Sequence, residues 1–203
     1  MKKYFLLPLI MVFWSCGGAK YTYFFDTGKQ LDFSEGKWIL NNTESNSVKF
    51  DRVLYDASLT EFEKILGDSL LEMHKLRSSK LVAPKIGFNL SERDLRELRQ
   101  NTDCDFLINI KGNAISDGAG SLTLGDETEN SSNRASISIS IYDLNAAILI
   151  SSSQVYGKTV HQEPIFPEDK NPPTLNPSSN MIMVKGAKKL IRKYGKNKLG
   201  GND

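Results

Sequence analysis

Residues 134–143, "RASISISIYD", alternate between two kinds of side chain, and this alternation constrains the fold more than any other feature of the chain. Isoleucine occupies positions 137, 139 and 141, whereas serine occupies positions 136, 138 and 140. Successive side chains of a β-strand point to opposite faces of a sheet. The pattern therefore predicts a strand that is buried on one face and polar on the other.

Two further runs flank this strand. The run "DFLINIKGNAIS" at 105–116 precedes it, and "AAILISSSQVYGK" at 146–158 follows it after the tight turn "DLNA". We therefore expect three consecutive strands that form a β-meander. Shorter strands are predicted at 38–40, at 48–55 and within "KLVAPKIGF", whose proline favours a sheet edge or a bulge.

Three segments have the periodicity of amphipathic helices. Thr60 and Glu63 have the spacing of a capping box, and apolar side chains then recur at three- and four-residue steps as far as Arg77. A second helix is expected to begin after Ser91, which lies three residues before Asp94. The apolar stripe of this second helix is narrow, so we expect it at the surface of the domain.

The third helix is expected to begin near Ser178 or Ser179 and to end before Gly195. Its apolar side comprises Met181, Val184, Ala187, Leu190, Ile191 and Tyr194. Its basic side comprises Lys185, Lys188, Lys189, Arg192 and Lys193. We expect the apolar side to dock on the sheet, and contact of the basic side with an anionic membrane or polymer is the alternative.

These elements predict an α+β (α/β/α-like) fold, a mixed sheet of about five strands with the β-meander and three helices packed on it. Residues 35–195 are expected to form one domain, and residues 196–203 a disordered tail. Residues 17–30 are either a linker or a first strand packed on this domain.

The N-terminus has the parts of a secretory signal. Lys2 and Lys3 precede an apolar run from Tyr4 to Trp14, which is shorter than the ~20 residues that span a bilayer. A small residue then marks a cleavage site. A cleaved signal with an incidental cysteine and an uncleaved anchor are two interpretations of this segment.

The favoured interpretation depends on Ser15 and Cys16, which follow the apolar run. With Gly17, they resemble a bacterial lipoprotein signal, although Phe13 and Trp14 replace its usual leucine and small residue. The resemblance implies cleavage between Ser15 and Cys16 and acylation of Cys16 by chains such as palmitate. Residues 1–15 would then be the signal peptide, and 16–34 a lipidated tether.

The second cysteine, Cys104, has no disulfide partner if Cys16 carries lipid. Its position before a strongly apolar run predicts a small buried residue. Removing Lys2 and Lys3 from the 26 basic residues leaves 24, against 24 acidic ones. A neutral mature chain lacks the basic bias of nucleic-acid-binding proteins, so we expect no nucleic-acid partner.

No motif predicts a catalytic residue, a cofactor or a metal site. The alternative is an envelope hydrolase that uses carboxylates, since Asp103 and Asp105 flank Cys104 and Asp117 opens a long irregular segment. That segment, 117–133, and a second one at 161–178 are candidate partner-binding loops. Their candidate contact residues are Asp117, Asp126, Glu127, Glu129, Pro164 and Phe166.

The order of elements, with "TDCDFLINIKG" and "SISISIYDLNAAILISSSQVYGK", resembles a group of Gram-negative envelope lipoproteins. The group includes the curli-secretion-channel lipoproteins, the lipoprotein activators of penicillin-binding proteins and the N-terminal domain of the Tol-Pal translocation protein. Residues 103–108 and 141–151 match its short motifs, and Ala146 and Ala147 depart from its usual turn. The resemblance implies a compact mixed sheet without a catalytic centre, which acts through protein partners.

The sequence therefore predicts a lipid-anchored, non-catalytic binding or assembly module of the Gram-negative envelope. We expect it at the outer membrane, held through its N-terminal lipid, with the periplasmic face favoured over the cell surface. A protein partner in the envelope is expected, and no oligomeric state is predicted.

Overall fold

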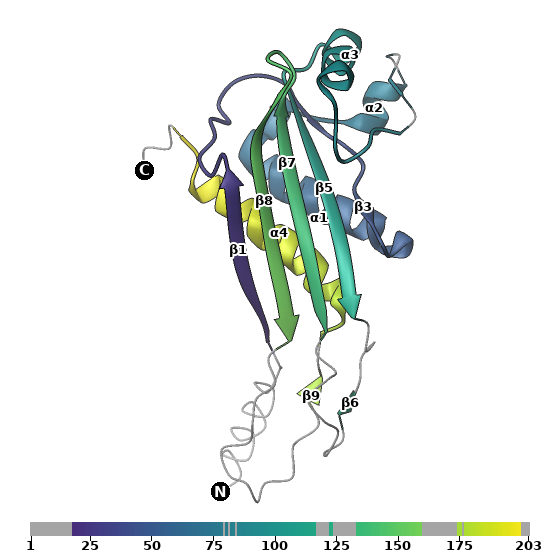
Figure 1. The fold of residues 1–203 in the computed structure, drawn as a ribbon, viewed down its shortest axis with the longest axis vertical. Helices are drawn as coiled ribbons and strands as arrows, with labels where there is room; N and C mark the ends of the chain where they lie inside the picture. The colour runs from purple at the N-terminus through teal and green to yellow at the C-terminus, as the bar shows by residue number, and fades with distance from the viewer. Residues whose placement is uncertain are drawn as a thin grey trace, which may run out of the picture.

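The computed structural model describes residues 18–78, 80, 82–83, 85–116, 122–123, 133–159, 174–175 and 177–199. An open mixed sheet forms its main body, with helices α1 (Val48–Leu66) and α4 (Ser179–Lys196) against one face (Figure 1). Two shorter helices, α2 (Met73–Arg77) and α3 (Glu92–Thr102), lie beside one end of the sheet. The predicted α+β fold with a mixed sheet is confirmed.

The sheet comprises β1 (Ala19–Thr27), β2 (Trp38–Leu40), β3 (Glu44–Ser45), β4 (Leu70–Glu72), β5 (Phe106–Ser116), β7 (Arg134–Asp143) and β8 (Ile148–Thr159). The strand order is β1-β8-β7-β5-β2-β4, and β3 pairs with β5. The first four strands are antiparallel neighbours, whereas β2 is parallel to both β5 and β4. A separate antiparallel pair joins β6 (Leu122–Thr123) to β9 (Thr174–Leu175). The described sheet thus has seven strands, against about five expected from the sequence.

The predicted β-meander is confirmed as β5, β7 and β8. Its register places Ile139 opposite Ile110 of β5 and Ser153 of β8. Ile137, Ile139 and Ile141 are at most 1% exposed, because they face α1 and α4 in the main core. The alternation of the sequence therefore reports the two faces of the sheet correctly.

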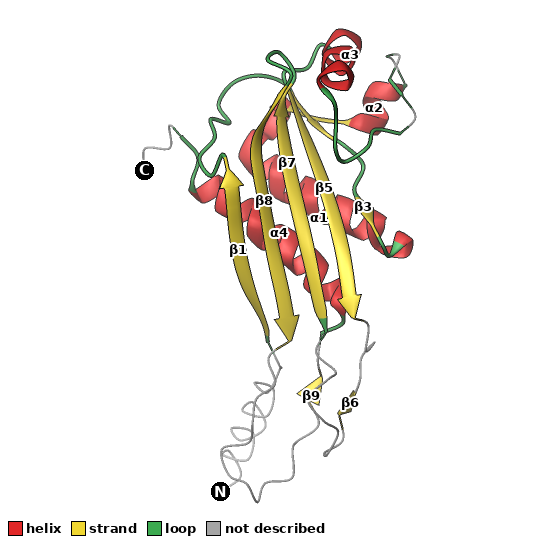
Figure 2. Cartoon of the chain, viewed as in Figure 1, coloured by secondary structure: helices red, strands yellow, loops and turns green. Residues whose placement is uncertain are grey.

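A smaller apolar cluster lies on the opposite face, at the end of the sheet covered by α2 and α3. Ile39 and Leu107 of the sheet pack there with Leu95 and Leu98 of α3 and with Cys104. The predicted burial of Cys104 and the surface position of α3 are both confirmed. The rest of this face, over β1, β8 and β7, carries no helix in the described part of the chain (Figure 2).

The predicted strand at 48–55 is wrong, because these residues form the first half of α1. Val48 and Val53 suggested a strand, but both lie on the exposed side of the helix, at 80% and 47% exposure. The proposed capping box is also wrong. Thr60 is in the middle of α1 rather than at its start, and its hydroxyl donates to the Asp56 carbonyl, 2.9 Å away.

The single helix expected up to Arg77 ends at Leu66. Gly67 stops it with φ of 54°, in the left-handed region that favours glycine. A short 3-10 helix (Gly67–Ser69), β4 and α2 follow. The apolar periodicity continues because β4 and α2 direct Leu70, Leu71, Met73 and Leu76 into the two apolar clusters.

The strand expected in "KLVAPKIGF" is also absent from its described residues. Side chains, rather than a neighbouring strand, bind the carbonyl groups of residues 86–88. Asn41 donates to the Ile86 carbonyl at 3.1 Å, and Asn109 donates to the next two carbonyls at 3.0 and 2.9 Å. The Tyr142 hydroxyl adds a fourth bond, to Phe88, at 3.1 Å.

The two remaining helices begin where expected. Ser91 and Asp94 form the predicted capping box of α3, and Ser178 caps α4. α4 docks on the sheet, as expected, but it runs to Lys196, past the predicted end before Gly195. The predicted apolar side is confirmed at Ala187, Leu190, Ile191 and Tyr194. It differs in the first turns, where Ile182 and Met183 are buried and Met181 is 48% exposed.

Candidate functional site

The predicted functional residues Ser15, Cys16, Asp117, Asp126, Glu127, Glu129, Pro164 and Phe166 all lie outside the described residues. Their roles in processing, acylation and partner binding stay predictions. The structure does place the chain that follows Cys16, because β1 begins only three residues later at Ala19. Of the two interpretations of residues 17–30, a first strand on the domain is therefore the one observed.

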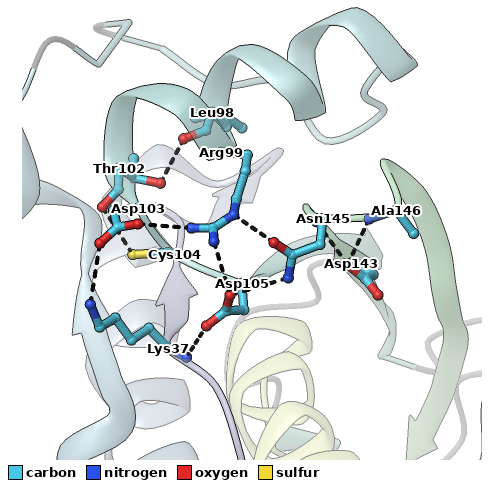
Figure 3. A network of polar contacts seen from close by, with 10 residues as sticks. All are labelled: Lys37, Leu98, Arg99, Thr102, Asp103, Cys104, Asp105, Asp143, Asn145 and Ala146. Carbon is cyan, nitrogen blue, oxygen red and sulfur yellow. Dashed lines mark hydrogen bonds and ion pairs between the residues drawn. The ribbon is translucent and has the colours of Figure 1, made fainter.

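The acidic residues beside Cys104 belong to a polar cluster at one end of the sheet (Figure 3). Asp103 follows α3 in a left-handed conformation, and its carboxylate binds Lys37 at 3.4 Å and Arg99 at 3.2 Å. Asp105 accepts the Lys37 backbone N–H at 2.8 Å and the Asn145 amide at 3.1 Å. Arg99 also donates to Asn145 at 2.6 Å.

This cluster joins the start of β2, the end of α3, the start of β5 and the turn between β7 and β8. The hydrogen bond from Lys37 lowers the pKa of Asp103, and the Lys37 backbone N–H lowers the pKa of Asp105. Burial raises the pKa of the Cys104 thiol, whose Sγ lies 3.5 Å from the Thr102 carbonyl. These are ionised carboxylates in ion pairs beside a neutral buried thiol, an arrangement that suits holding loops together.

The sequence indicated Asp103 and Asp105 but missed Lys37, Arg99 and Asn145 as their partners. Arg96, one turn earlier on the same helix, is exposed and pairs with Glu92 instead. Asp143 supports the cluster by accepting the backbone N–H groups of Asn145 and Ala146 at 2.8 and 3.0 Å. An aspartate before a turn is the local signal that could have indicated this.

A cavity of about 200 Å³ lies between α3 and the segment at 82–90. Its lining is mixed, with Val82, Ile86, Leu90 and Leu98 beside Lys85, Asn89, Asp94, Glu97 and Asn101. Asp94 already accepts the capping bonds of Ser91. The described residues contain no group of three or more His, Cys, Asp or Glu side chains that could hold a metal ion.

The outer edge of β1 is the more distinctive surface. β1 is nine residues long, contains no proline and pairs with β8 along one side only. In the described part of the chain, no strand pairs with its other side. A long edge strand presents a row of unpaired N–H and C=O groups, which can accept a strand from another chain.

The opposite side of the β-meander is closed by a side chain. Beyond β3, the Asn46 amide donates to the Ala114 carbonyl at 2.7 Å and accepts the Ala114 N–H at 2.8 Å. This two-way bond imitates a neighbouring strand at the free end of β5. A side chain therefore occupies the end of β5 beyond β3, whereas no strand among the described residues pairs with the outer side of β1.

Lysines of α4 border the open edge. Lys189 Nζ lies 4.4 Å from the centre of the Tyr21 ring, and Lys193 Nζ lies 4.4 Å from that of Tyr23. Lys185 continues the same four-residue spacing and is exposed. We call Lys185, Lys189 and Lys193 the lysine stripe. Burial of the ring raises the pKa of Tyr21 to about 12, so this residue stays a neutral hydrogen-bond donor.

None of the described helices is both long and apolar enough to cross a membrane. No protein-family model matches the sequence, and no curated protein matches it. Among solved structures, the chain is similar to the PelC dodecamer from Paraburkholderia phytofirmans. The identity is 10% and the TM-score 0.45, over 86% of this chain and 94% of that one.

Two other solved structures are similar at comparable levels. The hypothetical protein CT253 from Chlamydia trachomatis has 10% identity and a TM-score of 0.40, over 79% of this chain and 94% of its own. The lipoprotein GNA1162 from Neisseria meningitidis has 15% identity and a TM-score of 0.39, over 64% of this chain and 88% of its own. Similarity this low carries no conclusion about activity or partners, and membership of the envelope lipoprotein group stays a prediction.

Proposed function

We propose that this chain is a lipid-anchored, non-catalytic assembly module of the Gram-negative envelope, which binds a partner protein along the open edge of β1. The observation that carries the proposal is the contrast between β5 and β1, the two outer strands of the antiparallel part of the sheet. Asn46 plugs the edge of β5, whereas no described strand covers the nine residues of β1. An exposed edge of this length is a template for pairing with a strand of another chain.

The proposed occupant is an extended segment of the partner with acidic side chains at alternate positions. A strand added beside β1 would direct every second side chain toward α4. There it would meet the lysine stripe. Lys185, Lys189 and Lys193 form no ion pair with any described residue. Charge complementarity of this kind selects a partner and fixes the register of the added strand.

The proposed lipid anchor determines where in the envelope the binding edge of β1 lies. Acylation of Cys16 would attach lipid three residues before β1, so the binding edge would lie close to the bilayer surface. We place the module at the outer membrane, on its periplasmic face. The predicted loops at 117–133 and 161–178 would then extend the binding surface, since they follow β5 and β8 from the end of the sheet where β1 begins.

The experiment is site-specific photo-crosslinking in living cells, with a photoreactive amino acid in place of Thr22. Thr22 is exposed in the middle of β1, and Asn113 is a matched exposed position on β5. We expect one discrete adduct from position 22 and none from position 113. Lys189→Glu with Lys193→Glu should abolish that adduct, whereas Lys29→Glu with Lys196→Glu should leave it unchanged.

The mass of the adduct separates the possible occupants. An adduct with a protein that presents an acidic extended segment supports the proposal. An adduct of twice the mass of this chain would mean that a second copy pairs with β1 and would overturn it. An adduct that survives the charge reversal at Lys189 and Lys193 would also overturn it.

A further inference from the structure

The start of β1 lies in a row of positive charge on the face of the sheet that no described helix covers. The register places Lys20 opposite Lys158 of β8, and Lys158 opposite Arg134 of β7. All three side chains are exposed. We call Lys20, Lys158 and Arg134 the basic row.

Like charges directly opposite one another on neighbouring strands destabilise a sheet. Adjacent strands are ~4.8 Å apart, so the basic row places three cations within ~10 Å. Within the described part of the chain, Lys20 and Lys158 form no ion pair that would offset the repulsion between these two lysines. An anionic surface facing the row would convert this repulsion into binding.

From these observations we infer that the basic row contacts the headgroups of anionic lipids and holds this end of the sheet on the bilayer. The inference rests on the proposed acylation of Cys16. Lys20 is four residues after Cys16, and four residues of chain span at most ~14 Å. The headgroup layer is itself ~5–8 Å thick on each side of a bilayer, so Lys20 cannot be far from it.

The two other cations lie beside Lys20 rather than along the chain. Lys158 is the last residue but one of β8 and Arg134 is the first residue of β7, so the antiparallel order brings both to the membrane-proximal end of β1. Tyr156 and Phe24 follow on the same face, and Phe24 is 51% exposed. Aromatic side chains beside basic ones are typical of the interface between water and lipid.

The opposite end of the sheet provides an internal control. Lys29 follows β1 and Lys196 ends α4, and both are exposed. The backbone bond from Leu199 to Leu31 shows that these two segments lie together. Lys29 is nine residues from Lys20, which corresponds to ~30 Å along a strand. This is well beyond the ~8 Å over which charges act at physiological salt.

The experiment uses the full mature protein, purified from membranes and added to preformed vesicles. One set of vesicles contains only phosphatidylcholine, and the other contains phosphatidylcholine with phosphatidylglycerol. Flotation of the vesicles first shows whether the protein is anchored. A water-soluble amine reagent then labels the exposed lysines, and mass spectrometry measures the labelling at each position.

We expect phosphatidylglycerol to reduce the labelling of Lys20 and Lys158 about five-fold, and high salt to restore it. The labelling of Lys29 and Lys196 should be the same in both vesicles. Lys20→Gln should weaken the protection of Lys158, whereas Lys29→Gln should not. These variants remove one exposed charge each and should leave the fold intact.

Equal labelling of Lys158 in both kinds of vesicle would overturn the inference while leaving the anchor in place. That result would mean that other groups neutralise the basic row, such as the carboxylates of Asp117, Asp126, Glu127 and Glu129 in the segment after β5. A protein that does not float with the vesicles lacks the anchor, and then both the proposed function and this inference fail. Flotation therefore tests the lipid anchor, and lysine labelling tests the contact of the basic row with anionic lipid.

Discussion

Arg192 of α4 forms a forked ion pair with Glu61 of α1. The Nε–Oε2 distance is 2.9 Å and the Nη2–Oε1 distance is 2.6 Å. The Glu61 side chain is only 3% exposed, and Lys64 lies 3.2 Å from the same carboxylate. This pair joins the two helices that cover the main core, so the packing of α1 against α4 depends on the charge of Glu61.

Acid should weaken this contact. The hydrogen bonds from Arg192 lower the pKa of Glu61 to about 2, against the opposing effect of burial. The same carboxyl has a pKa of ~4.3 in an unfolded chain, so the folded state binds its proton less tightly. The stabilisation is therefore complete above pH ~4.3 and is lost as the pH falls toward ~2.

Glu61→Gln should remove this part of the pH dependence, and urea denaturation at a series of pH values measures it. The variant should be less stable than the parent at neutral pH, and the difference should shrink as the pH falls. Glu63→Gln is the matched control, because Glu63 is exposed on the same helix. A constant difference between Glu61→Gln and the parent at every pH would contradict the role of this ion pair.

Asn109→Ala should lower the free energy of unfolding by about 2 kcal/mol, because buried partners are left without hydrogen bonds. Asn109 is 1% exposed, binds the carbonyls of Gly87 and Phe88, and accepts a bond from Asn41 at 3.0 Å. Asn113→Ala, at an exposed position on the same strand, should change stability little. Equal effects of the two substitutions would show that the 86–88 segment is held in another way.

Gly157→Ala should destabilise the domain by roughly 1–3 kcal/mol through overpacking. A Cβ at this position would collide with Cγ2 of Ile182 and lie 2.8 Å from Cε1 of Tyr21. In the background of Ile182→Ala, which removes the colliding methyl group, the same substitution should cost much less. Thermal denaturation of the four proteins of this cycle measures the coupling, and strictly additive effects would contradict close packing of α4 on β8.

The sequence predicted the β-meander well because β5, β7 and β8 each have one buried and one polar face. The spacing of Ile137, Ile139 and Ile141 therefore indicates which face of β7 is buried in the folded domain. The capping residues of α3 and α4 were equally local signals. In these parts of the chain, short-range preference and long-range packing agree.

The missed parts depend on contacts between residues distant in sequence. Asn41 is 45 residues from its partner Ile86, and Asn109 is 22 and 21 residues from its partners Gly87 and Phe88. No local pattern therefore indicates that residues 86–88 form a loop. The first half of α1 was predicted as a strand because it contains Val48 and Val53, and β-branched residues favour strands. In the structure both valines lie on the exposed side of the helix. Residues 19–27 were ambiguous because Phe24 and Phe25 interrupt the alternation, although they lie on opposite faces of β1.

The candidate site was predicted only in part, for the same reason. The lipid attachment at Cys16 is predicted from a local motif and stays a prediction. The open edge of β1, the plug formed by Asn46 and the basic row all depend on which strands become neighbours. Asn46 and Ala114 are 68 residues apart, and nothing in either segment indicates their pairing.

The central claim is that Cys16 is the acylated first residue of the mature protein, and mass spectrometry of the N-terminal peptide tests it most directly. The protein would be purified from membranes of a Gram-negative host. We expect a peptide that begins at Cys16 and carries the mass of its acyl chains, and no such peptide from the Cys16→Ser variant. A mature chain that begins elsewhere, or one with an unmodified Cys16 thiol, would contradict it.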